Sequence, residues 1–177
     1  MPSKFDLDTI GHMDHLVQGF ETTDQIGMVL RVHLQVERTV EVFLKGVLTQ
    51  EMLEVFNVPQ SFAHKVMLAT ALGFPKELAL ASLSMNSLRN KFAHEAGRVL
   101  KAKDVQDLED KYEAARIAIK PELYQMQGSA IRVKSLGGEK ITYGTKGVEW
   151  DFKMVAGALS GLMLRYLVDL NAVPGEA

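Results

Sequence analysis

The stretch from residue 22 to residue 48 constrains the fold more than any other part of the chain. Its apolar residues recur at the three- and four-residue spacing of a helix, and residues 22–24 (Thr-Thr-Asp) supply side chains that cap a helix N-terminus. This predicts one long helix with a broad apolar stripe containing Ile26, Val29, Leu30, Val36, Val40, Phe43, Leu44, Val47 and Leu48. The opposite, polar arc is expected to hold Arg31, Gln35, Arg38, Glu41 and Lys45.

The same periodicity predicts further helices between the remaining Gly and Pro residues. Their expected ranges are Asp8 to about Phe20, the residues after Ser61 up to Ala71, Lys76 to Ala93, Asp104 to Ile119 and Trp150 to Leu170. Residues 131–134 and 140–143 alternate apolar and polar side chains around Gly137-Gly138, which predicts a β-hairpin. We therefore expect one domain, residues 1–177, that is a mainly α, up-and-down bundle of five or six helices with a small β-hairpin before the last helix.

The composition restricts where the protein acts and what it binds. A net charge of -2 gives no global attraction for nucleic acid, so any site for a polyanion must be local. Cysteine is absent, which excludes disulfides and fits a reducing compartment. The longest uncharged apolar run, between Lys153 and Arg165, is shorter than the ~20 residues that cross a bilayer, and its Gly157 and Gly161 are expected to allow close packing. We expect a cytoplasmic protein with no membrane association.

An arginine and a histidine lie close together near the end of one predicted helix. Arg89 can hold a phosphate bidentately, and the imidazole of His94 can move a proton near neutral pH. These two groups suffice for RNA cleavage without a metal, so we expect neither a metal nor a cofactor. His12 and His15 flank Asp14 without a matched carboxylate cluster, which does not indicate a metal site.

The pattern of Arg89-Asn90 followed by His94 resembles the signature of the HEPN superfamily of small helical domains, which includes toxin and defence ribonucleases and catalytically silent relatives. The resemblance implies that Arg89 and His94 form the functional pair, with Asn90 as the neighbour of the arginine. It also implies a homodimer in which two subunits form one cleft, with RNA as a possible substrate and an antitoxin as a possible partner. Leu83 and Ser87 stand where several active families carry an acidic residue and a lysine.

A second resemblance covers roughly residues 24–97. Residues 68–74 (Leu-Ala-Thr-Ala-Leu-Gly-Phe), followed by a helix that ends near Glu95, are similar to the layout of the mannitol operon repressor family. Residues 31–38 also fit the preceding helix of such proteins. This resemblance implies a non-enzymatic regulatory or protein-interaction module, with a regulatory protein as its partner.

Two polar residues, His33 and Glu37, fall inside the apolar stripe of the long predicted helix. They are spaced i, i+4, so their side chains are neighbours, and a carboxylate placed there requires a partner. Arg89 or His94 is the expected partner of Glu37. Two interpretations stay open: a structural cluster that holds two helices in register, or a site in which Glu37 positions Arg89 or raises the pKa of His94.

The predicted hairpin is basic. Arg132, Lys134 and Lys140 are candidate contacts to an RNA backbone, although a solvated hairpin or a dimer arm fits the same pattern. Three residues of the long helix are also expected outside its apolar stripe, where a second copy could cover them: Met28, Leu34 and Val42.

Overall fold

The computed structural model describes residues 5–8, 14–123, 125–132 and 137–172. Its elements are α2 (Asp14–Glu21), α3 (Gln25–Val47), α4 (Gln50–Val55), α5 (Phe62–Ala71), α6 (Lys76–His94), α7 (Ala102–Ile119), β1 (Ala130–Arg132), β2 (Lys140–Thr142) and α8 (Val148–Ala172). The fold is mainly helical, with a small antiparallel hairpin before the last helix, and confirms the expected fold class.

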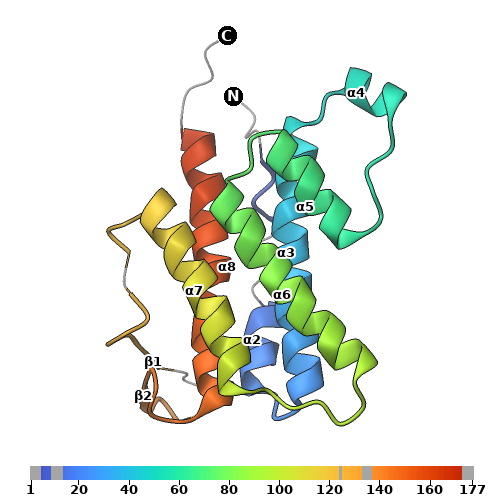
Figure 1. Cartoon of the computed structure of the whole chain (residues 1–177). Coiled ribbons are helices and arrows are strands. Elements are labelled where there is room, and N and C mark those ends of the chain that lie inside the picture. The colour runs from blue at the N-terminus through green and yellow to red at the C-terminus, as the bar shows by residue number, and fades with distance from the viewer. Residues whose placement is uncertain (1–4, 9–13, 124, 133–136, 173–177) are drawn as a thin grey trace.

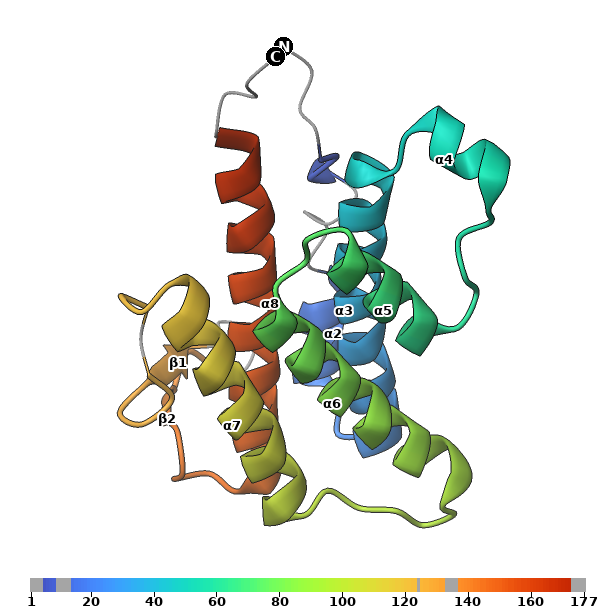
Figure 2. The ribbon, with the colours of Figure 1, turned by 45° about the horizontal axis from the view of Figure 1, so that its top comes forward.

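Four long helices enclose the core (Figure 1). Helix α3 packs on α6, α6 on α7, α7 on α8, and α8 back on α3. Helix α2 lies against α3 and α8, while α5 lies against α3 and α6. The apolar side chains that face the interior include Val36, Met85, Leu108 and Leu159. Helix α4 stands away from this bundle at one end and contributes no buried residue (Figure 2).

Capping side chains determine where α3 and α4 begin. The Asp24 carboxylate accepts hydrogen bonds from the N–H groups of Ile26 and Gly27 at 3.0 and 2.9 Å, so α3 begins where the sequence predicts. The Thr49 hydroxyl accepts the Met52 N–H at 3.3 Å and starts α4. The sequence did not predict α4, because its few apolar side chains form no stripe that a core could bury.

A tight turn positions α5 beside α6. Gly73 adopts φ +97°, a left-handed conformation that favours glycine, and the Phe74 N–H reaches back to the Ala69 carbonyl at 2.9 Å. Pro75 follows at the N-cap of α6 rather than at its first helical position. Because the turn is short, the two helices pack on each other and on the same side of α3.

Helix α3 buries more of its surface than predicted. Met28 and Val42 are buried within the chain, and so is Gln35, which was expected on the polar arc. The reason is that α3 packs against four helices, α2, α5, α6 and α8, rather than presenting one face to a core. Leu34 is exposed as expected, whereas Ile26, expected in the stripe, is also exposed. The surface available to a second copy along α3 is correspondingly smaller.

Gly157 on α8 permits a close approach by α2. A Cβ at Gly157 would lie 2.9 Å from Cζ of Phe20, so a larger residue would displace the Phe20 ring from α8. This confirms the packing role expected for Gly157, but Gly161 is exposed and meets nothing within 4 Å, so the expectation was wrong there. None of the helices in the described ranges is both long and apolar enough to span a bilayer.

The predicted hairpin is present, and its second strand ends at Thr142, one residue before the predicted end. Strands β1 and β2 pair antiparallel, with Ile131 opposite Ile141, and residues 133–136, including Lys134, lie outside the described residues. Ile141 is buried, and the Tyr143 hydroxyl donates a hydrogen bond to Oε2 of Glu109 at 2.7 Å. These contacts hold the hairpin against α7.

Candidate functional site

A polar cleft of about 330 Å³ opens between α3, the start of α5 and α6. It combines residues from three separate parts of the chain. Its lining residues are His33, Glu37, Gln60, Ser61, Phe62, Ala63, Asn86, Arg89 and Asn90. Four residues predicted from the sequence, His33, Glu37, Arg89 and Asn90, therefore meet in one place.

His33 forms the buried wall of the cleft. Its ring is 5% exposed, packs edge-on to Phe62 at 4.7 Å between centroids, and places Nε2 3.2 Å from Oδ1 of Asn86. Burial lowers the pKa of His33 below its ordinary value, and the nearby charge of Arg89 acts in the same direction, while Glu37 and Asn86 oppose the shift. His33 is accordingly neutral at pH 7.

Glu37 pairs with a residue that the sequence did not indicate. Its Oε1 lies 2.8 Å from Nζ of Lys65 on α5, and Lys65 also donates to Glu41. Burial works against the charge of Lys65, but the two carboxylates outweigh it and raise the pKa of Lys65 above its ordinary value. The expectation that Glu37 pairs with Arg89 or His94 was wrong, because α5 brings a cation closer to α3 than α6 does.

Arg89 remains open to the cleft. It is half-buried, and its Nη1 donates a hydrogen bond to Oδ1 of Asn90 at 3.0 Å. Among the described residues, no carboxylate lies within ion-pair distance of its guanidinium. A guanidinium held by one amide keeps further N–H donors for an anion.

His94 lies elsewhere. It is the last residue of α6, is exposed, and does not line the polar cleft. Five positions along an α-helix turn a side chain by about 140°, so Arg89 and His94 point to different sides of α6. One chain therefore does not bring the two signature residues together.

The basic residues of the hairpin are far from the polar cleft. Arg132 and Lys140 are exposed partners across the strand pair, which lies beside α7, whereas the cleft is on α3, α5 and α6 (Figure 1). Lys146, next to them, is paired with Glu139 at 2.8 Å. Lys134 belongs to the segment that is not described.

Sequence reasoning missed the contribution of the segment before α5. Gln60, Ser61 and Phe62 line the cleft, and Lys65 closes it on one side by its bond to Glu37. The signal that could have indicated Lys65 is that it is the one lysine or arginine in α5. Without the position of α5, that cation had no assigned partner.

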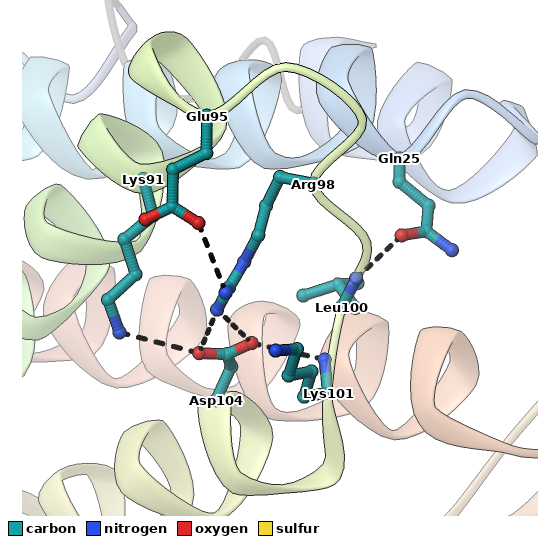
Figure 3. Close-up of polar contacts among 7 residues, drawn as sticks. All are labelled: Gln25, Lys91, Glu95, Arg98, Leu100, Lys101 and Asp104. Carbon is teal, nitrogen blue, oxygen red and sulfur yellow. Dashed lines mark hydrogen bonds and ion pairs between the residues drawn. The ribbon is translucent and has the colours of Figure 1, made fainter.

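A second polar cluster lies just beyond the polar cleft along the chain, where the C-terminal end of α6 meets the start of α7 (Figure 3). Arg98 Nη2 lies 2.7 Å from each oxygen of Asp104, and the Lys101 N–H donates to the same carboxylate at 3.1 Å. Lys91 and Glu95 complete the cluster at 3.4 Å from Asp104 and 3.3 Å from Arg98. We call this set of residues, from Lys91 to Asp104, the Asp104 cluster. It fastens the connection between α6 and α7, and so fixes the end of α6 that carries His94.

The site shows no metal-binding chemistry in the part of the chain that the structure describes, where three His, Asp or Glu side chains nowhere gather suitably for a metal ion. His12, and the side chain of His15, fall outside that part.

Comparison with known proteins adds no family: the chain matches no protein-family model, and no curated protein or solved structure is significantly similar to it. The polar cleft is therefore the feature of this chain that bears on its function.

Proposed function

We propose that the protein is a HEPN-like domain whose polar cleft binds a phosphate group, with RNA as the class of ligand, and that a single chain binds RNA without cleaving it. The observation that carries this proposal is the state of Arg89, a half-buried guanidinium in an open cleft, hydrogen-bonded to an amide and not to a carboxylate within the described chain. Arginine in this state offers a planar, always charged fork that fits a phosphate bidentately.

The surroundings of Arg89 support an anionic ligand. Glu37, the one carboxylate among the described residues that line the cleft, is paired with Lys65, which also binds Glu41. His33 carries no charge at neutral pH, and the amides of Asn86 and Asn90 add uncharged hydrogen-bonding groups suited to phosphate or ribose. Arg89 is therefore a cation of the cleft that no described carboxylate pairs with, and its guanidinium can bind an anionic ligand.

A binding measurement tests the proposal directly. A short fluorescein-labelled single-stranded RNA is titrated with wild type and with the variants Arg89→Met and Arg89→Lys, with inorganic phosphate as competitor. We expect Arg89→Met to weaken binding roughly tenfold or more, and Arg89→Lys to recover only part of it, because lysine keeps the charge but loses the fork. Arg165→Lys on α8, where arginine already pairs with Asp169, is the matched control. RNA affinity unchanged by Arg89→Met would refute the proposal.

A ribonuclease is the second candidate, and the exposure of His94 favours it. A second copy of the chain could bring its own His94 to the Arg89 of the first, which is the two-fold composite cleft implied by the HEPN resemblance. Purified protein incubated with total RNA in EDTA would then cleave it, and Arg89→Ala and His94→Ala would each be inactive. Mixing the two inactive variants would restore about a quarter of the activity, since half of the dimers are mixed and each has one intact site. Failure of the mixture to recover activity excludes a composite site.

In the regulatory interpretation, the ligand or partner binds in the same polar cleft. A non-enzymatic module like the mannitol operon repressor relatives would use Arg89 to hold an anionic ligand or an antitoxin or regulatory protein partner, in the cytoplasm. Arg132 and Lys140 on the hairpin remain candidate secondary contacts to an RNA backbone. Wild type that binds RNA but leaves it intact in EDTA at all concentrations supports this interpretation over the nuclease.

A further inference from the structure

A second cleft adjoins the polar cleft at Gln60 and lies where α4 stands off the bundle. It measures about 520 Å³ and is bounded by the end of α3, the α4 segment and α5. Its walls are chiefly apolar, formed by Leu44, Leu48, Leu53, Val58 and Pro59, and Lys45 lies at its rim. We call it the α4 cleft. Its size falls in the range of about 300 to 1,000 Å³ that is usual for small-molecule sites.

Two apolar side chains of this cleft, Leu53 and Val58, are left partly exposed by the described residues. Leu53 and Val58 are 42% and 37% exposed, and α4 as a whole has no buried residue. Figure 2 shows the α4 segment reaching outward from α3 and returning to α5, so the segment forms one wall of the cleft. An apolar occupant would cover Leu53 and Val58 and join α4 to α3.

The charged residues at the rim indicate which charge the polar group of the ligand carries. Glu41 lines the cleft but is bonded to Lys65, which also holds Glu37. Lys45 is exposed and forms no ion pair with any described residue. Lys65 is thus shared between two carboxylates, whereas Lys45 is the cation of the cleft that pairs with no described carboxylate, and its free ammonium complements an anionic head group.

The size of the cleft argues for a small molecule over a protein helix. A single helical turn with its side chains occupies roughly 400 Å³, so the α4 cleft would hold little more than one turn of a partner. We propose that the α4 cleft binds an amphipathic carboxylate of the medium-chain fatty-acid type, with its alkyl chain between α3 and α4 and its carboxylate at Lys45.

Calorimetric titration of the full chain with hexanoate, octanoate and decanoate tests this proposal. We expect one saturable site whose affinity rises about fourfold for each added methylene, because each buried methylene contributes a constant transfer free energy. Octanol should bind less tightly than octanoate, and Lys45→Met should weaken octanoate by roughly two- to fivefold without affecting octanol. Affinity that does not depend on chain length, or equal affinity for octanol and octanoate, would overturn the assignment.

Two aspartate variants on the same short helix provide the sharpest control. Leu53 lines the cleft, whereas Val55 is 84% exposed and does not, so Leu53→Asp should abolish octanoate binding and Val55→Asp should leave it intact. Val58→Asp repeats the test from the following loop. Sedimentation of the same variants checks for a second copy in the cleft: a dimer lost only in Leu53→Asp, with no octanoate bound by wild type, refutes the proposal.

Discussion

Arg98 and Arg89 belong to neighbouring parts of the chain, yet their surroundings are opposite. Arg98 is closed off by the carboxylate of Asp104 in the first turn of α7, with side chains 12% and 6% exposed, and it also pairs with Glu95 at the end of α6. Arg89 meets an amide and faces an open cleft. The contrast shows that a carboxylate nearby in sequence makes an arginine a structural tie, whereas an arginine surrounded by neutral amides keeps its charge for a ligand.

Breaking the Asp104 cluster should have the largest effect on stability. Asp104→Asn leaves Arg98, whose side chain is 12% exposed, with only the exposed Glu95 as a charge partner, and we expect a loss of about 2 to 3 kcal/mol. Urea denaturation followed by circular dichroism measures the free energy of unfolding. Asp107→Asn, on the exposed side of α7, should change it by less than about 0.5 kcal/mol. Similar losses of unfolding free energy in both variants would mean that the ion pairs of Asp104 do not stabilise the fold.

His33 should make stability depend on pH. Because its pKa is lowered in the folded protein, the unfolded chain binds the proton first as pH falls below about 6.5. Stability is then lost on acidification, with a slope of no more than about 1.4 kcal/mol per pH unit from this one group. His33→Gln should reduce the slope between pH 7 and 5, whereas His64→Gln, at an exposed position of α5, should not. An unchanged slope in His33→Gln would show that the cleft wall does not disfavour the imidazolium.

Removing the charge of either carboxylate that binds Lys65 should lower the free energy of unfolding by less than Asp104→Asn does. Glu37→Gln is expected to lower the free energy of unfolding by about 1 kcal/mol, and Glu41→Gln, which is more exposed, by less. Lys65 keeps one partner in each single variant, so the double variant should lose more than the sum of the two. Chemical denaturation of all three variants measures the coupling. Strict additivity would contradict a shared cation.

Arg89→Met should have the smallest effect on stability of the four, within about 0.5 kcal/mol of wild type or slightly stabilising, because no carboxylate is left unpaired when it is removed. The same substitution should have the largest effect on RNA binding. Measured side by side, Arg98→Met should destabilise the fold and Arg89→Met should not. A large loss of unfolding free energy in Arg89→Met would mean that Arg89, like Arg98, stabilises the fold.

Much of the helical framework follows from the sequence, for local reasons. The start of α3 follows from the Asp24 cap, and the end of α5 from Gly73. Helix α4 was missed because six residues with one capping threonine carry too little periodicity to indicate a helix. The Asp104 cluster was also missed, since nothing in the residue types distinguishes Asp104 from the exposed acids around it on α7.

The candidate site was predictable in its residue types but not in its pairings. The helical wheel placed His33 and Glu37 on the core side of α3, and the signature pointed to Arg89 and Asn90. The wheel gives the direction of a side chain around one helix, but not which other helix lies opposite. Lys65 could therefore not be assigned to Glu37.

The sequence by itself determined the helices, their caps and the residue types of the polar cleft, because these depend on interactions among residues a few positions apart. Tertiary structure alone decided that Lys65 takes Glu37, that Arg89 stays open while Arg98 is closed, and that α4 stands off to leave an apolar cleft. The physical reason is that an ion pair or a cleft depends on the distance between groups from different helices. Packing of the whole core sets that distance, and no local pattern encodes it.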